Sequence, residues 1–257
     1  MSETLQLIEG RRSLRRYADR PIAPDQADLI IHAAMRAPTA GNMMLYSIIE
    51  VDQPASKRRL AETCGHSFIA DAPLVFVFLA DLQRWVDLFD SNAVPTKLRE
   101  AGEEYTMPDL SKLLMACCDA LVAAQNSVIA AESLGIGSCY IGDILGNAEE
   151  HRSLLDLPPF AFPIALLCYG YPPDGFEPPR SERFEARFIR HRNQYQRFSG
   201  DELTEMLSEI DAKLSTLLEQ KGITLAEMTY RGFIGGKSSR EQRRSVQALL
   251  EPWVADQ

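Results

Sequence analysis

The spacing of apolar residues predicts a chain of helices interleaved with strands. Apolar positions recur at helical spacing across 21–38 (PIAPDQADLIIHAAMRAP), where prolines mark both ends, and across 54–64. Apolar runs rich in β-branched and aromatic residues predict strands at 45–51, 72–81, 136–144 and 162–172. The run 72–81 (APLVFVFLAD) is apolar almost throughout, which is typical of a central strand buried on both faces.

The longest helical pattern covers 109–134 and is apolar on nearly every side. Such a helix is expected at the centre of a molecule or in a subunit interface. Asp119, Gln125 and Asn126 interrupt its apolar stretch, so we expect a buried helix rather than a membrane span.

Neither a linker nor an internal repeat divides the sequence, and two amphipathic helices, at 199–222 and 238–254, come last. We therefore predict one domain over 1–257, with 196–257 as a C-terminal helical extension. The expected fold class is α+β, with helices flanking a mixed β-sheet.

Composition and charge narrow the functional classes. The 257 residues include 27 basic and 36 acidic side chains, giving a formal net charge of −9 at pH 7. This balance argues against a nucleic-acid binder or a protein of anionic membranes, because both need a basic surface. Five cysteines without a CxxC pair and four scattered histidines predict neither a disulfide framework nor a metal site. The start of the sequence lacks a secretory signal, so we expect a cytoplasmic protein.

Against this acidic background, the stretch 11–17 (RRSLRRY) contains four arginines. Most arginine clusters are solvated charged surface, and that interpretation stays open here. Ser13 favours a second interpretation, because a hydroxyl and forked guanidinium donors together bind phosphate. Another arginine group, Arg180 and Arg183 within 178–195, either reaches the same anion or belongs to a polar loop.

Two further stretches are rich in small residues. The loop 36–44 (RAPTAGNMM) fits a helix-ending turn, or a close approach of backbone to a flat ligand with the Asn42 amide as donor and acceptor. In 133–144 (SLGIGSCYIGDI), Gly137 and Gly142 suit either strand irregularities or contact with a ligand ring. The GxGxxxxG spacing after a helix does not match the dinucleotide-binding fingerprint.

These four stretches, in this order, resemble the FMN-dependent nitroreductase family, and most of all its NADPH-linked oxygen-insensitive nitroreductase and flavin reductase branch. RRSLRRY is similar to the family's Arg-x-Ser-x-Arg signature, APTAGNMM to its loop beneath the flavin, and AAESLGIGSCYIGD to the end of its central helix. Arg183, followed by the HRNQY segment at 191–195, is similar to a phosphate-binding arginine of the family. The resemblance extends from Leu5 to about Tyr195.

The resemblance implies an intertwined homodimer with FMN at its interface and NADPH as the electron donor. It implies ping-pong, two-electron reduction of nitroaromatics, quinones or flavins, with no metal, nucleic-acid or membrane partner. The implied catalytic residue is Arg15, which would stabilise negative charge on the reduced flavin. The implied cofactor-binding residues are Arg11, Arg12, Ser13, Arg15, Thr39, Ala40, Asn42, His66, Tyr140, Ile141, Gly142 and Arg183.

The sequence departs from the family pattern near the expected site. Asp143 and Leu145 stand where the branch has glycine and arginine, and Ser181 stands where a basic residue is usual. His66 occupies a position at which the branch often has glutamine, and two methionines replace the common glutamine of the loop beneath the flavin. These changes concern ring electronics and substrate choice more than FMN binding.

Two alternative functions stay open. One is a flavoenzyme on the same scaffold with another chemistry, namely dehalogenation, enoate reduction or ring oxidation. The other is a non-enzymatic dimer that binds a phosphorylated ligand through the arginine loop. The basic stretch 237–244 (KSSREQRR) is interpreted as an exposed helix face, or as a site for the 2′-phosphate of NADPH.

Overall fold

The computed structural model describes residues 1–254, which form two compact units. The first unit contains residues 1–179 together with the chain from Glu241 onward, and the second contains Arg180–Arg240. The expected extension at 196–257 does not coincide with either unit: the second unit begins before it, and the described residues 241–254 belong to the first unit.

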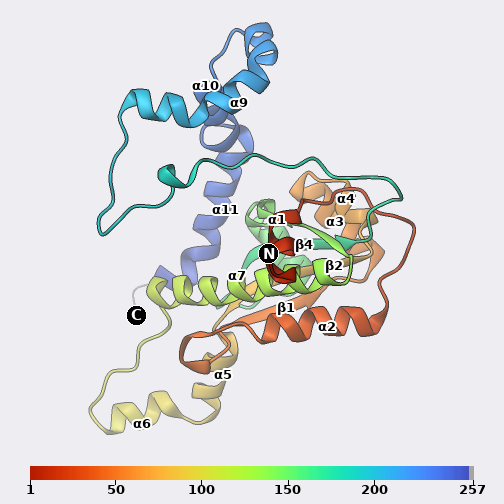
Figure 1. Ribbon diagram of the computed structural model, residues 1–257. Helices are drawn as coiled ribbons and strands as arrows, with labels where there is room; N and C mark the ends of the chain where they lie inside the picture. Colours follow the sequence, from red (N-terminus) through yellow and green to blue (C-terminus); the bar gives the residue numbers. More distant parts are fainter. Residues whose placement is uncertain (255–257) are drawn as a thin grey trace. The chain divides into compact units, whose positions relative to one another are not determined.

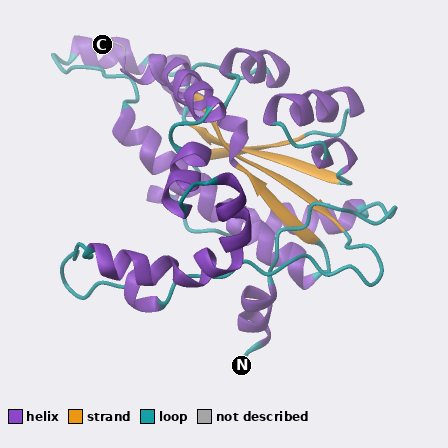
Figure 2. Cartoon of the chain, turned by 90° about the horizontal axis from the view of Figure 1, so that it is seen from above, coloured by secondary structure: helices purple, strands orange, loops and turns teal. Residues whose placement is uncertain are grey.

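The first unit is built on a four-stranded sheet, drawn in orange in Figure 2. Its strands are β1 (Tyr46–Glu50), β2 (Leu74–Asp81), β3 (Gly137–Ile141) and β4 (Ala161–Gly170), in the order β1-β2-β4-β3. Every pair of neighbouring strands is antiparallel. A single parallel bridge, between Ser13 and Ser138, joins the arginine segment to β3. The predicted strands and the mixture of helix and sheet are confirmed.

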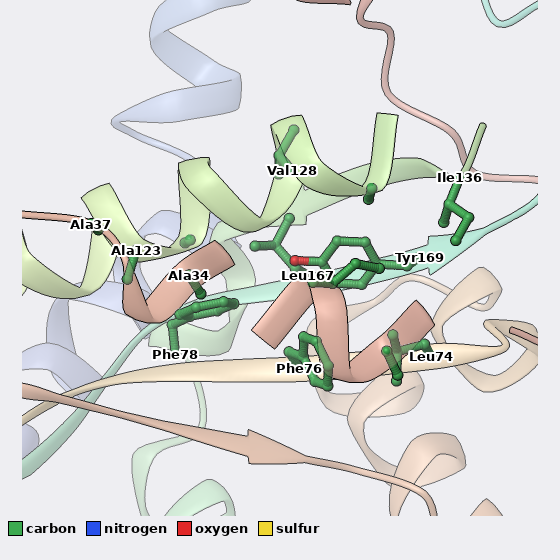
Figure 3. Close-up of a cluster of buried hydrophobic side chains, with 14 of the residues drawn as sticks. Ala34, Ala37, Leu74, Phe76, Phe78, Ala123, Val128, Ile136, Leu167 and Tyr169 are labelled. Atoms are coloured by element: carbon green, nitrogen blue, oxygen red, sulfur yellow. The ribbon is translucent and has the colours of Figure 1, made fainter. Parts of the chain in front are cut away.

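The two faces of the sheet bury two different apolar clusters. Alternate side chains of β2, such as Phe76 and Phe78, pack with helices α2 (Pro24–Met35) and α7 (Leu110–Ser133), as Figure 3 shows. Val75 and Val77 point to the other face, where they pack with α3 (Pro54–Cys64) and α4 (Phe68–Asp71). Every residue of β2 is buried, which confirms the predicted central strand.

Helix α7 lies along the sheet (Figure 1), and its two faces differ in the size of their apolar side chains rather than in polarity. The face that packs on the sheet carries alanines, including Ala116, Ala120 and Ala123, all fully buried. The exposed face carries larger apolar residues, with Leu114 at 68% and Leu121 at 42% exposure. By length and composition alone this helix is apolar enough to span a membrane, but its alanine face is part of the core of the first unit.

The remaining helices of the first unit are α1 (Glu3–Gly10), α5 (Gln83–Ser91), α6 (Val94–Glu100) and α8 (Ala148–Leu155). The second unit contains α9 (Gly200–Lys221) and α10 (Leu225–Phe233), and α11 (Lys237–Val254) continues into the first unit. The last turns of α11 bury Leu249 and Trp253, whose indole ring lies edge-on to Phe160 at 5.1 Å between centroids. These turns therefore belong to the core rather than to a loose tail.

Candidate functional site

The arginine segment is held against β3 by its backbone and by one buried leucine. The Leu14 amide donates to the carbonyl of Ser138 at 2.9 Å, and Leu14 is only 1% exposed. A Cβ on Gly137 would lie 2.8 Å from Leu14 Cδ2, so only glycine permits this approach. Gly137 therefore makes room for Leu14, and it also lines the cavity beside Arg12, so its contact with a ligand stays a prediction.

The side chains of this extended segment lie in two different environments. Arg15, Ser13 and Arg11 lie beside the buried thiol of Cys139: burial raises the pKa of that thiol, and these three neighbours act in the opposite direction. Arg12 instead donates from Nη1 to Glu177 Oε2 at 2.9 Å and to the carbonyl of Pro178 at 3.0 Å. Arg11 also acts on Glu132, which lines a cavity beside Arg12. Arg11 and Arg12 therefore lie near one cavity, whereas Arg15 lines another.

A cavity of about 370 Å³ lies beside Arg12, lined also by Leu14, Glu132 and Phe176. Burial raises the pKa of the Glu132 carboxyl to about 7, against the opposing effect of Arg11. One of its oxygens, Oε1, is buried and has no hydrogen-bond partner among the described residues. At neutral pH this carboxyl is therefore partly protonated, which limits its repulsion of an anion in the same cavity.

A second cavity, of about 510 Å³, opens beside Arg15 and is lined also by Arg16, Arg20 and Phe68. The Arg20 guanidinium lies over the ring of Tyr171 at 3.7 Å, and that of Arg16 lies 5.7 Å from the centre of the Phe176 ring. Within residues 1–254, no carboxylate forms an ion pair with these three arginines. Asp19 and Asp71 line the same cavity without forming an ion pair with these arginines, so the guanidinium donors are available to an anionic ligand although the cavity also carries negative charge.

At the end of β3, a ligand could reach the main chain more easily than the side chains. Ile141 is 2% exposed and packs into the cluster beneath α3, so only its main chain can meet a ligand. Tyr140 is half-buried, its hydroxyl donates to Gln125 at 3.4 Å, and burial raises its pKa to about 12. A Cβ added to Gly142 would meet no atom within 4 Å, so this position borders open space.

His66 and Asp143, two positions at which the sequence departs from the family pattern, contact one another. The distance from His66 Nε2 to Asp143 Oδ2 is 3.0 Å, and each side chain keeps about 40% exposure. The other carboxylate oxygen, Oδ1, accepts a hydrogen bond from Gln242 Nε2 at 3.0 Å. Gln242 lies on α11 and was not predicted, because a lone glutamine on an amphipathic helix gives no signal in the sequence.

The loop after α2 is organised by Asp119, a buried carboxylate of α7 that the sequence showed only as an interruption of an apolar helix. Asp119 accepts hydrogen bonds from the Thr39 hydroxyl at 2.5 Å, the Ala40 amide at 3.1 Å and the Leu45 amide at 3.3 Å. With this support the loop holds Asn42 in a left-handed conformation (φ 57°) and exposes it. Its backbone shape is therefore fixed before any ligand binds.

The predicted cofactor residues form separate groups in a single chain. The loop at Thr39 is bound to Asp119, whereas the arginine segment neighbours Glu132, further along α7. At 1.5 Å per residue, these two positions lie about 20 Å apart along the helix axis. Arg183 lies in the second unit, where its Nη1 donates to the carbonyls of Ser181 and Glu182, and its place at the phosphate stays a prediction.

Comparison with known proteins gives a consistent answer. The nitroreductase family model matches residues 8–171. The chain is 32% identical over 251 residues to the oxygen-insensitive NADPH nitroreductase of Salmonella typhimurium, covering 97% of each sequence. It is 29% identical over 252 residues to the FMN reductase [NAD(P)H] of Bacillus subtilis, covering 98% of this chain and 92% of the relative.

Solved structures agree with this assignment. NfrA1 nitroreductase from B. subtilis superposes with a TM-score of 0.79 at 26% identity, covering 96% of this chain and 98% of that one. NADPH:FMN oxidoreductase from Vibrio harveyi, complexed with NAD+, gives 0.79 at 25%, covering 97% and 98%. The sequence motifs, the arrangement around β3 and α7, and these similarities lead to one conclusion: the chain belongs to the nitroreductase family.

Proposed function

We propose that this chain is an FMN-dependent NAD(P)H oxidoreductase. The observation that supports it most strongly is the group of arginines around a segment fixed on β3, three of which have no ion pair among residues 1–254, in a chain of net charge −9. Relatives that match nearly the whole chain are named as an FMN reductase and an NADPH nitroreductase. A non-enzymatic phospholigand dimer has no comparable support.

The residues present fit FMN. Arg12 already binds an anionic oxygen, because its Nη1 forms an ion pair with the Glu177 carboxylate. The position of that carboxylate oxygen marks where a phosphate oxygen would bind. Ser13 and Arg11 lie on the same segment and would hold the phosphate and ribityl chain. The open position at Gly142 and the exposed backbone at the end of β3 leave room for a flat ring. Arg183 would add a further donor to the phosphate.

Bound FMN would supply the two-electron chemistry, accepting hydride from a nicotinamide nucleotide and passing electrons to an acceptor. The protein contributes binding, orientation and electrostatics. Arg15 is exposed and free of carboxylate partners within residues 1–254, so its charge is available to stabilise negative charge at the pyrimidine edge. We assign the catalytic role to this residue.

A homodimer would complete the site. The loop at Thr39 and the arginine segment are about 20 Å apart along α7, and the loop of one protomer would serve the cofactor held by the other. The exposed apolar face of α7, with Leu114 and Leu121, is a suitable contact surface. Replacing Leu121 with Asp should therefore cost both dimer and flavin, which light scattering and absorbance measure together. A flavin-loaded monomer would contradict this assembly.

NADPH is the proposed donor, because it is named for the Salmonella relative. The basic stretch 237–244 gives this choice little support. Arg244 binds Glu149 through two hydrogen bonds, at 2.7 and 2.8 Å, and Glu241 at 2.7 Å, so it is already neutralised. Within that stretch, only the remaining basic residues are open to a 2′-phosphate.

The proposed reaction is ping-pong, with nitroaromatics, quinones or free flavins as acceptors. Initial rates measured at several NADPH and quinone concentrations test this order, because a ping-pong enzyme gives parallel double-reciprocal lines. Intersecting lines would mean that both substrates bind together, and FMN titration of the apoprotein would still decide cofactor identity. Dehalogenation, enoate reduction and ring oxidation are tested with the corresponding acceptors on the same FMN-loaded protein.

A further inference from the structure

His66 and Asp143 are arranged as an imidazole that could donate a proton and a carboxylate that orients it. An ionised carboxylate has no proton to donate and can only accept hydrogen bonds. In the 3.0 Å contact with Asp143, Nε2 of His66 is therefore the atom that carries the proton. Nδ1 is the other ring nitrogen, and it has no hydrogen-bond partner among residues 1–254. Both side chains are about 40% exposed, so a substrate can reach the imidazole.

The pair is fixed from several directions. Gly65, in a left-handed conformation (φ 71°), ends α3, and the His66 amide then donates to the carbonyl of Ala61 at 3.0 Å. The imidazole packs against Phe68, with 5.4 Å between ring centres. Gln242 holds the second oxygen of Asp143. Both partners are thus oriented without a ligand, as a positioned acid requires.

The surroundings place this pair at the proposed cofactor site. Asp143 directly follows Gly142, the open position at the end of β3. Phe68, which packs on His66, lines the same cavity as Arg15. The imidazole therefore contacts Asp143, which follows the backbone assigned to the flavin ring, and Phe68, which lines the cavity beside Arg15.

We propose that His66 donates a proton to the acceptor during its reduction, and that Asp143 is the residue that positions it. This rests on the proposed function. Reduction of a quinone to a hydroquinone needs two electrons and two protons. NADPH supplies a hydride, which is equivalent to both electrons and one proton. The second proton passes from His66 Nδ1 to a quinone oxygen. Solvent then returns a proton to Nδ1, so the net reaction converts quinone, NADPH and one proton into hydroquinone and NADP+.

Two acceptors separate proton donation from other effects. A quinone needs the proton, whereas ferricyanide takes one electron at a time and needs none. His66→Gln should lower kcat with the quinone about 10²-fold more than it lowers kcat with ferricyanide, because a weaker FMN contact affects both acceptors equally whereas loss of the general acid affects only the quinone. Asp143→Asn should lower the quinone rate less, with the same dependence on acceptor. Equal loss with both acceptors in His66→Gln overturns the proposal.

His32 supplies a matched control, because it is an exposed histidine of α2. His32→Gln should leave both rates unchanged. The apoprotein provides a test without turnover: diethylpyrocarbonate, which modifies accessible imidazoles, should label His66 several times more slowly once FMN is added, while labelling of His32 stays constant. Labelling of His66 that ignores bound FMN overturns the proposal. If the parent protein binds no FMN, the proposed function itself fails, a result distinct from either of these.

Discussion

The guanidinium of Arg12 and the carboxylate of Glu177 form an ion pair at 2.9 Å between residues far apart in the sequence. Glu177 is 83% exposed at its side chain, so little holds it in place besides Arg12. An anion that entered the neighbouring cavity would compete with this carboxylate for the same nitrogen. The pair therefore links cofactor affinity to a residue that the sequence did not single out.

Replacing Arg12 should lower the affinity for FMN, and replacing its partner Glu177 should raise it. Arg12→Ala, and likewise Arg183→Ala, should weaken FMN binding by roughly 10- to 100-fold, since a hydrogen bond to a charged group contributes about 1.5–3 kcal/mol. Glu177→Gln should strengthen it by no more than about fivefold, because exposed pairs are worth about 0.2–1 kcal/mol. Fluorescence titration of the apoproteins measures all three.

Arg58→Ala is the control for that titration, since Arg58 is an exposed arginine on α3. It should bind FMN like the parent. If Arg12→Ala also binds like the parent, Arg12 is not a phosphate ligand and its pairing with Glu177 is structural only.

Asp119→Asn should disorder the loop at Thr39. The substitution turns one acceptor oxygen into a donor facing the hydroxyl and amides that Asp119 now accepts from. The expected loss is about 2–3 kcal/mol in the free energy of unfolding. Urea unfolding of the apoprotein measures it, with the exposed Asp28→Asn as control. A loss no larger than that of the control would show that the loop does not depend on Asp119.

Two glycines of the β3 region should respond differently to alanine. Gly137→Ala forces Leu14 away from β3, because the new Cβ would lie 2.8 Å from Leu14 Cδ2, so it should lower both stability and FMN affinity. Gly142→Ala meets no atom within 4 Å and should leave the stability of the apoprotein unchanged. It should nevertheless weaken FMN binding if the ring lies there. Parent-like FMN affinity in Gly142→Ala would remove this position from the site.

The carboxyl of Glu132 should make stability depend on pH. Its pKa is about 7 in the native chain and about 4.5 when unfolded, so the native state holds a proton that the unfolded state has lost. Stability therefore falls as pH rises through this window and is level on either side of it. Since Glu132 is only partly buried, screening reduces the effect to about 1 kcal/mol.

Glu132→Gln removes this contribution. Urea unfolding of the apoprotein at the two ends of the window should show a smaller decrease for the variant than for the parent. Equal decreases would mean that Glu132 titrates normally.

Much of the architecture could be predicted because it depends on local patterns. The run of β2 is apolar at every position, and α7 has Asp109 as its N-cap at one end and Gly135 in a left-handed conformation just beyond the other. Helices α5, α6 and α8 were missed, being short and rich in polar residues. An amphipathic helix was predicted for α11, but its pattern could not show that Leu249 and Trp253 are buried in the core of the first unit.

The site was predictable in its residue types but not in its contacts. Four arginines around a serine indicated an anion site, yet the sequence cannot show that Arg12 and Arg15 lie in different surroundings. His66 and Asp143 are 77 residues apart, so their contact depends on the packing of α3 against the turn after β3. Asp119 appeared only as a polar interruption, because its hydrogen-bond donors come from a distant loop.

The most direct test of the account is anaerobic mixing of the purified protein with NADPH in a stopped-flow spectrometer. The parent protein should show the visible absorption of bound FMN and lose it on mixing, and air or quinone should restore it. Arg15→Ala should bleach about 10²–10³ times more slowly, the loss expected for one preorganised donor, while its FMN affinity falls less than that of Arg12→Ala. A colourless protein that FMN does not reconstitute, or a yellow one that NADPH does not bleach, would contradict the assignment as an NAD(P)H-dependent flavin enzyme.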